Sequence, residues 1–244
     1  MLNQIRDALV ALVALVAMAN AMNILPAMHA LADPAPQEST LRFEVMLDGR
    51  PIGGHALTFD PQPDGSLKVA IDIDLDIRLG PFTVFAYNHR NRTLWRAGKL
   101  LSLQSETDDN GTEYRIRATA GSQGLQIHAN DEAPFTISAS TLPSTYWMAT
   151  TIQQNQLINP QTGELLEISV RKVGREQVTG PSGLFEATHF RMEGDLEIDL
   201  WYDDTGVLVG LAFETRGSQV TYRLVERQGN VPASSADTVL NMRN

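Results

Sequence analysis

The side chains best suited to chemistry lie between residues 81 and 95, where aromatic and imidazole groups alternate with arginines. On an extended strand Tyr87, His89 and Trp95 share one face, and the arginines occupy the other. Aromatic rings with polar tips suit the mouth of a cavity that holds an apolar ligand with a polar end. An ordinary core with an amphipathic rim uses the same residue types, and the sequence leaves that alternative open. An aromatic pair further along the chain completes the predicted ligand-binding set, which is Tyr87, His89, Trp95, Tyr146 and Trp147.

No motif in the sequence indicates catalytic residues. The glycines around Ser182 lack the spacing of a nucleophile elbow and are typical of a turn. Asp203 and Asp204 are adjacent, so on a strand they point to opposite faces and cannot flank one bond. We therefore predict a protein that is not an enzyme. The alternative is a hydrolase that uses His89 or His189 as its general base.

We expect neither a metal nor a cofactor. Asp72, Asp74 and Asp76 resemble the first half of a calcium-binding loop, but Ile77 stands where that loop needs a glycine. No two histidines have the His-x-His or His-x3-His spacing typical of zinc sites, and the chain has no cysteine. We interpret the three aspartates as the solvated face of a strand.

The elements that must position these residues are strands, because the hydrophobic period is two. In residues 69–79 the apolar side chains fall on one face and mostly charged ones on the other, and residues 41–47 and 196–200 repeat the alternation. Turn signals such as Asn110-Gly111 and Arg216-Gly217 separate the runs. The pattern predicts hairpins that follow one another in sequence.

One short helix is predicted from Ser144 or Thr145, either of which could cap it, to Ile152. A large sheet that is wet on one side must hide its other face, and curling around such a helix does so. The predicted fold is all-β, with a single large curled antiparallel sheet or a partly open β-barrel and one short helix against the concave face.

The N-terminus has the features of an export signal. Residues 8–25 are an apolar run behind Arg6, and Ala30-Leu31-Ala32 matches the small-x-small pattern of a cleavage site. We expect cleavage after Ala32 and a periplasmic location, and a leader retained as an anchor is the alternative. The predicted division of the chain is a signal peptide at 1–32, a linker at 33–39, an antiparallel β domain at 40–227 and a flexible tail at 228–244.

The formal net charge of the chain is −10. An acidic surface repels phosphate backbones and anionic membrane faces, so we do not expect nucleic acid as a partner. We also expect no stable membrane span once the leader is cleaved. The predicted partner is an apolar small molecule or another envelope protein.

Short motifs spread over nearly the whole mature chain resemble a bacterial family of exported proteins with a domain of unknown function. One is the hairpin sequence Trp201-Tyr202-Asp203-x-x-Gly206, which is also distantly similar to the half-barrels that carry lipoproteins across the periplasm. Met148 departs from the family pattern, which has asparagine after the Tyr-Trp pair. The resemblance implies an exported β-fold and supplies no catalytic residue. The other matching motifs lie at 87–89, 95–100, 107–111, 144–147, 161–163, 174–176 and 194–196.

Our leading hypothesis from the sequence is a periplasmic, non-enzymatic binding protein for a lipid or another apolar ligand. The runner-up is an envelope interaction or structural module that acts through a sheet face or edge. The histidine-dependent hydrolase is the third hypothesis. A hollow sheet interior favours the first of these, and a contiguous apolar patch outside the interior favours the second.

Overall fold

The computed structural model describes residues 37–233. The predicted signal peptide at 1–32, the start of the linker and the end of the tail lie outside the described residues. Within this range the strands run from Ser39 to Gln228.

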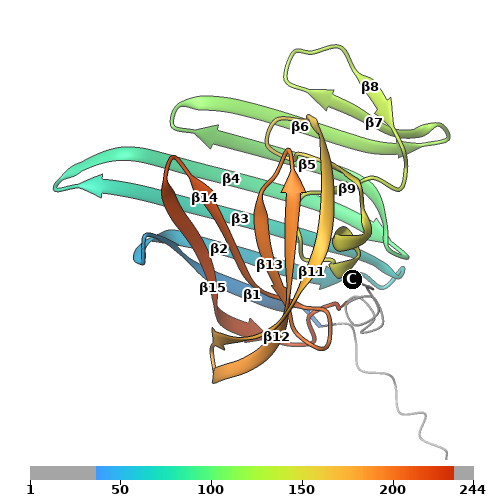
Figure 1. The fold of residues 1–244 in the computed structure, drawn as a ribbon. Helices are drawn as coiled ribbons and strands as arrows, with labels where there is room; N and C mark the ends of the chain where they lie inside the picture. The colour runs from blue at the N-terminus through green and yellow to red at the C-terminus, as the bar shows by residue number, and fades with distance from the viewer. Residues whose placement is uncertain (1–36, 234–244) are drawn as a thin grey trace, which may run out of the picture. The chain divides into compact units, whose positions relative to one another are not determined.

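Fifteen strands form one sheet (Figure 1). Most connections are tight turns, because the predicted turn residues such as Asn110 and Arg216 adopt positive φ angles of 53° and 51°. The first eight strands are β1 (Ser39–Leu47), β2 (Arg50–Pro61), β3 (Ser66–Leu79), β4 (Phe82–Arg96), β5 (Lys99–Asp109), β6 (Thr112–Gly121), β7 (Gly124–Ala129) and β8 (Phe135–Ile137). They are followed by β9 (Leu142–Pro143), β10 (Gln156–Ile158), β11 (Leu165–Gly180), β12 (Gly183–Gly194), β13 (Ile198–Tyr202), β14 (Leu208–Thr215) and β15 (Ser218–Gln228).

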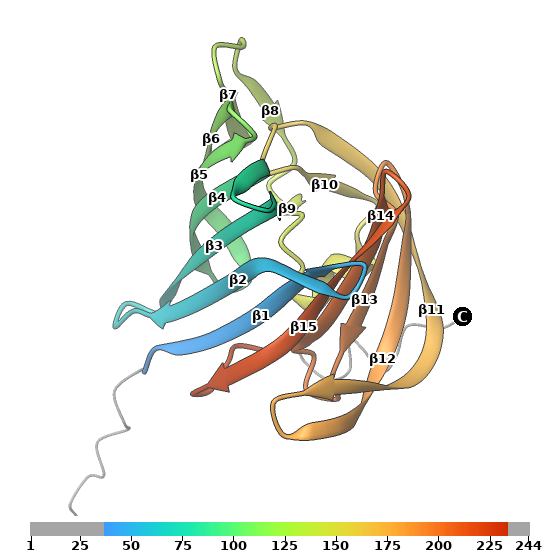
Figure 2. The same cartoon turned by 90° about the vertical axis from the view of Figure 1, so that its left-hand side faces the viewer.

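The first and last strands lie side by side in the middle of the sheet. β1 pairs with both β2 and β15, so the strand order is β8-β7-β6-β5-β4-β3-β2-β1-β15-β14-β13-β12-β11-β10-β9. The sheet curls so that its two halves face each other (Figure 2), and β8 and β9 at its ends are not paired with one another in the described chain. The predicted curled, partly open antiparallel sheet is confirmed. One pairing differs from that prediction, since β9 and β10 run parallel.

The register of β3 against β4 follows from the alternation read in the sequence. Asp72 lies opposite Arg90, and the outer face carries ion pairs of 2.8 Å from Arg90 to Asp74 and from Arg92 to Asp72. Ile71 on the inner face is 3 % exposed. A shift of one residue would place the aspartates in the core, so the pattern fixes the register. The three aspartates form the solvated strand face that their spacing predicts.

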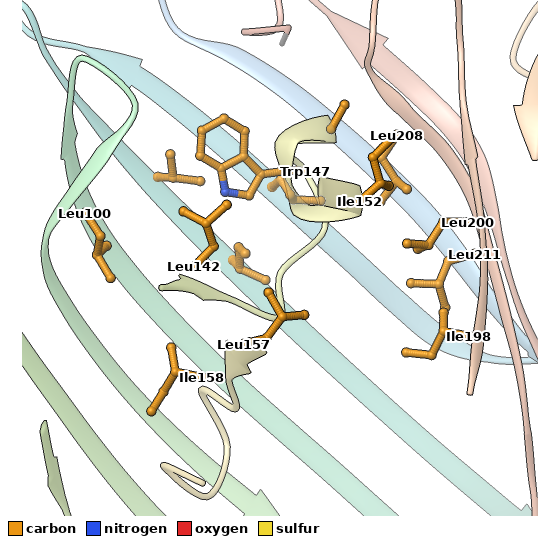
Figure 3. Packing of buried hydrophobic residues seen from close by; sticks show 14 of the residues in the cluster. Leu100, Leu142, Trp147, Ile152, Leu157, Ile158, Ile198, Leu200, Leu208 and Leu211 are labelled. Carbon is orange, nitrogen blue, oxygen red and sulfur yellow. The ribbon is translucent and has the colours of Figure 1, made fainter. Parts of the chain in front are cut away.

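The core is filled by residues 142–158, which we call the inner segment. This segment lies within the curl of the sheet, and its side chains point between strands of the two halves (Figure 3). The Trp147 ring packs edge-on against Phe59 and Trp95 of the sheet, with centroids 5.3 and 5.4 Å apart. Leu157 has no exposed surface. The inner segment thus buries the concave face that a single curled layer cannot bury alone.

The helix in the inner segment is shorter than the sequence predicted. It is a 3₁₀ helix, η1 (Ala149–Gln153), which Met148 precedes without a side-chain cap. Ser144 and Thr145 lie in a turn instead, because Tyr146 adopts a left-handed conformation with φ of 58° that interrupts any helix before residue 147. The predicted caps at Ser144 and Thr145 were therefore wrong. No helix within residues 37–233 is long and apolar enough to cross a membrane.

The hairpin of β3 and β4 extends beyond its neighbours as a two-stranded ribbon. Its last pair with β2 joins Leu75 to Gly53, and its last pair with β5 joins Tyr87 to Asp109. Residues 77–85 therefore pair only with each other, and the ribbon projects from the sheet in Figure 1. Phe82 and Val84 near its tip are 71 % and 54 % exposed.

Leu157→Ala tests whether the inner segment is an essential part of the core. The substitution leaves a cavity among fully buried side chains, so we expect it to lower the free energy of unfolding by about 2–5 kcal/mol. The matched control is Leu184→Ala, because Leu184 is 68 % exposed, and it should change stability by less than about 0.5 kcal/mol. Urea denaturation of the two variants measures the difference, and equal stabilities would contradict this role of the segment.

Candidate functional site

A cavity of about 420 Å³ opens between the two halves of the sheet. One wall comes from β2, β3 and β4, and a second from β14, β15 and the residues around the start of β13. Residues 144–146 of the inner segment and residues 159–161, which follow it, cover the cavity. Its size lies within the range of roughly 300–1,000 Å³ usual for small-ligand pockets. The apolar part of the lining consists of Ile71, Ile73, Leu196, Ile198, Leu211 and Phe213.

Two histidines on the first wall give the cavity polar groups. His55 of β2 and His89 of β4 both lie opposite Ile73 of the intervening β3, so the three side chains form one row across the inner face. Nδ1 of His89 is 2.8 Å from Oγ1 of Thr107. Nε2 of His55 is buried and has no hydrogen-bond partner among the described protein groups. The ring of His55 meets the edge of Tyr222 at a centroid distance of 5.6 Å.

The interior of the cavity carries no formal charge at neutral pH. Burial lowers the pKa of His55 to about 3, and the neighbouring His89 adds to that effect. Burial also lowers the pKa of His89 to about 4, so both imidazoles are neutral. Burial raises the pKa of Tyr222 to about 12 and also raises the pKa of Tyr146, so both phenols keep their protons. No lysine or arginine lines the cavity in the described chain.

The rim of the cavity is acidic. Asp195, Glu197 and Glu214 line it and are exposed to solvent. Glu197 also forms an ion pair of 3.1 Å with Arg191. Within residues 37–233 no cluster of three or more metal-ligating side chains is arranged to hold an ion. The cavity therefore has a negatively charged rim and an uncharged interior.

The structure separates the five residues of the predicted ligand set. His89 and Tyr146 line the cavity, and the Tyr87 hydroxyl accepts a hydrogen bond from the side-chain amide of Gln161, which lines it too. Trp95 and Trp147 instead pack against each other in the core and border a separate depression of about 320 Å³. Trp95 stands six residues beyond His89 on β4, which corresponds to roughly 20 Å along a strand.

Several cavity residues were not found from the sequence. His55 and Tyr222 lie on β2 and β15, which meet the cavity because β1 joins them side by side. Their inward direction could have been read from the alternation with Leu57 and Leu224, both of which are buried. The pairing of the first and last strands has no signal in the sequence, so their approach to His89 could not be predicted.

Asn91 adds a further polar group to the inner face of β4. It lies two residues from His89 and has no exposed surface, and neither atom of its side-chain amide has a hydrogen-bond partner in the described part of the chain. Its neighbour across the strands is Ser105, which donates to the carbonyl of Pro160 in the cavity lining. Unsatisfied buried polar groups are uncommon in folded proteins. Of the five residues with such groups in the described chain, His55 lies in the cavity wall and Asn91 next to it.

The hairpin sequence at 201–206 anchors the cover of the cavity. The hydroxyl of Tyr202 donates a hydrogen bond of 2.7 Å to the carbonyl of Tyr146, and Tyr202 has no exposed surface. Oδ1 of Asp203 accepts bonds of 2.9 and 3.0 Å from the amides of Thr205 and Val207, which closes the turn after β13. This turn fixes the end of β13 and so the position of the tyrosine that holds the cover.

His189, the other histidine considered as a general base, lies on the outer face. Its ring stacks on Trp201 at 4.5 Å, and Nδ1 and Nε2 lie 2.8 and 2.7 Å from carboxylate oxygens of Glu176 and Asp199. Because both ring nitrogens face carboxylates, neither is free to take a proton from a nucleophile. Hydrogen bonds from Trp201 and His189 hold the pKa of Glu176 below its usual range. None of these four residues lines the cavity, and the cluster joins β11, β12 and β13 on the outer face.

The comparisons with known proteins bear on family and fold. A family model described as "Domain of unknown function (DUF6134)" matches residues 43–225. The chain is also similar to a solved structure described as a beta-barrel-like protein of domain of unknown function DUF1849 from Brucella abortus, with a TM-score of 0.57 and 10 % sequence identity over 78 % of this chain and 96 % of that one. At that identity the likeness concerns the fold alone. No curated protein matches the sequence.

The neutral state of His55 makes stability depend on pH. Its folded-state pKa of about 3 lies below the ordinary value of 6.5, so between these values the unfolded chain binds a proton that the folded chain does not. The contribution is therefore complete above pH 6.5 and is lost as the pH falls. His55→Phe keeps a ring against Tyr222 but removes this titration. Relative to the variant, the wild type should lose about 1 kcal/mol per pH unit between about pH 6 and about pH 4.5.

Urea denaturation of both proteins at several pH values measures this difference. Carboxylates titrate in the same range but contribute equally to the two proteins, so they cancel in the comparison. Parallel stability profiles for wild type and variant would show that His55 is not held neutral by burial.

Proposed function

The chain belongs to the family described as domain of unknown function DUF6134, and we propose that it is a non-enzymatic binding protein whose cavity holds a lipid or another apolar small molecule. The observation that carries the proposal is the cavity of about 420 Å³ between the two halves of the sheet. It combines apolar walls with a few polar groups, which is the usual composition of a small-molecule site. The barrel-like fold is consistent with a binding role.

The walls support an apolar ligand in particular. Ile71, Ile73 and Leu211 give one part of the lining, and Phe213 and Ile198 extend it toward the rim. An apolar molecule in this space removes its own surface and that of the walls from water, at roughly 25 cal/mol per Å². The side chains that supply this surface come from two separate parts of the sheet, β3 and the paired strands β13 and β14, so the folded sheet forms the site before any ligand binds.

We further propose that the protein works in the bacterial periplasm, on the basis of the predicted leader with cleavage after Ala32. The proposed relation to the half-barrels that carry lipoproteins rests on the sequence at 201–206 and agrees with an open, curled sheet around an apolar interior. Under this proposal the ligand enters through the open rim of the cavity.

The second candidate function is an envelope interaction module. It is favoured by the exposed apolar tip of the β3–β4 ribbon, where Phe82 and Val84 project beyond the sheet. Exposed apolar groups outside a cavity are a feature of surfaces that bind other proteins. The ribbon and the cavity can be altered separately, so variants distinguish the two functions.

Extraction of the protein from its host tests the first function directly. Protein purified from the cell envelope without detergent should release one apolar compound or a related series into organic solvent, and mass spectrometry should detect it in stoichiometric amounts. An extract with no compound above that of a control protein, repeated over preparations, would count against the proposal.

Leu211→Trp tests whether the cavity is the place of binding. The larger ring occupies the ligand volume, so we expect affinity for the apolar dye N-phenyl-1-naphthylamine to fall at least about tenfold. Phe82→Ser is the control, because Phe82 is 71 % exposed and does not line the cavity. Dye fluorescence measures binding, and circular dichroism checks that both variants fold. If Phe82→Ser reduces binding and Leu211→Trp does not, the ribbon is the site instead.

A further inference from the structure

The cavity wall contains a polar group without a hydrogen-bond partner, and this group indicates the chemical class of the ligand. Nε2 of His55 is buried without a hydrogen bond in the described chain, on a side chain that lines the cavity and is 9 % exposed. A buried polar atom without a partner destabilises the folded protein. Nε2 itself has under 1 Å² of accessible surface, so a ligand group reaches it only when the ring turns toward the cavity that its side chain lines. A ligand that makes this hydrogen bond removes the penalty, so the position beside His55 selects for a polar group on an otherwise apolar molecule.

The lining excludes a charged group at that position. An anionic head has no lysine or arginine to meet inside, and it would have to pass Asp195, Glu197 and Glu214 at the rim. A cationic head finds its carboxylates only at the rim, where they are exposed to solvent. A buried charge needs a partner of opposite charge close by. The interior offers instead a neutral imidazole pair and phenol hydroxyls.

We propose that the ligand is an uncharged amphiphile whose hydroxyl or carbonyl group enters first and bonds to His55, while its apolar chain lies along Ile73 and Leu211 toward the rim. This inference rests on the proposed function of the cavity and adds the class and the orientation of the ligand. A neutral imidazole has one N–H donor and one acceptor nitrogen, so it can serve either a carbonyl or a hydroxyl. His89, already bonded to Thr107, completes the polar end of the site.

The test compares three probes that share one chain and differ in charge: 1-decanol, decanoate and decylammonium. Each competes with N-phenyl-1-naphthylamine for the wild-type protein at neutral pH and at low and high salt. We expect 1-decanol to bind at least about tenfold more tightly than either ion, with no dependence on salt. Decanoate or decylammonium binding as tightly as the alcohol at both salt concentrations would overturn the inference.

Failure of the inference differs from failure of the proposed function. If neither the dye nor any of the three probes binds, the cavity is not a site for apolar ligands. If all three bind with equal affinity and Leu211→Trp abolishes that binding, the cavity is a site but the head group does not reach His55.

Variants of His55 then place the head group. His55→Phe should weaken the binding of 1-decanol about fivefold to tenfold, because one hydrogen bond is lost. It should leave the affinity for decylammonium unchanged. His128→Phe is the matched control, since His128 is exposed on β7 and does not line the cavity. His55→Gln keeps a donor and an acceptor and should bind 1-decanol within about threefold of wild type. An equal loss of affinity for 1-decanol in His55→Phe and His55→Gln would overturn the inference. If neither variant folds, the comparison of the three probes on the wild-type protein decides.

Discussion

The packing of the inner segment against the concave face of the sheet is the interaction on which the rest of the structure depends. A single curled layer has one apolar face, and that face must be covered for the sheet to be stable. Residues 142–158 cover it at one end, where Trp147 lies between Phe59 and Trp95. Beside His55 and His89 the segment does not fill the space above the sheet, and the cavity opens there under residues 144–146. The same element thus stabilises the fold and sets the limits of the site.

The distribution of charge follows from this arrangement. Ion pairs such as Arg90 to Asp74 lie on the outer face of the sheet, in contact with water. The inner face has histidine, asparagine, serine and threonine in place of charged residues, and burial keeps the histidines neutral. Polar groups on such a face add hydrogen-bonding capacity without the cost of a buried charge. A ligand inside therefore meets specific hydrogen-bonding groups but no electrostatic attraction, and any attraction arises at the rim.

Local patterning predicted much of the fold. The alternation in residues 69–79 gave a strand and its wet face, and the turn signals gave the hairpins, because strand direction and turn type depend on neighbouring residues. The inner position of Tyr87, His89 and Trp95 on β4 also followed from the period of two. The predicted start of the helix at Ser144 was wrong, because Tyr146 adopts a left-handed conformation in place of the expected cap, and the hydroxyl of Tyr202 bonds to the carbonyl of Tyr146. That hydrogen bond joins residues 56 positions apart, and no local pattern reports it.

The sequence by itself determined that the chain forms a large antiparallel sheet with one apolar face, and that aromatic and imidazole groups lie on that face. Only the tertiary structure decided which of them meet at the cavity. His55, His89 and Tyr222 come together because β1 pairs with both β2 and β15, whereas Trp95 and Trp147 are drawn into the core by the inner segment. The physical reason is that side-chain direction is set by the residue's own strand, but the choice of neighbouring strand is set by burial of the whole concave face.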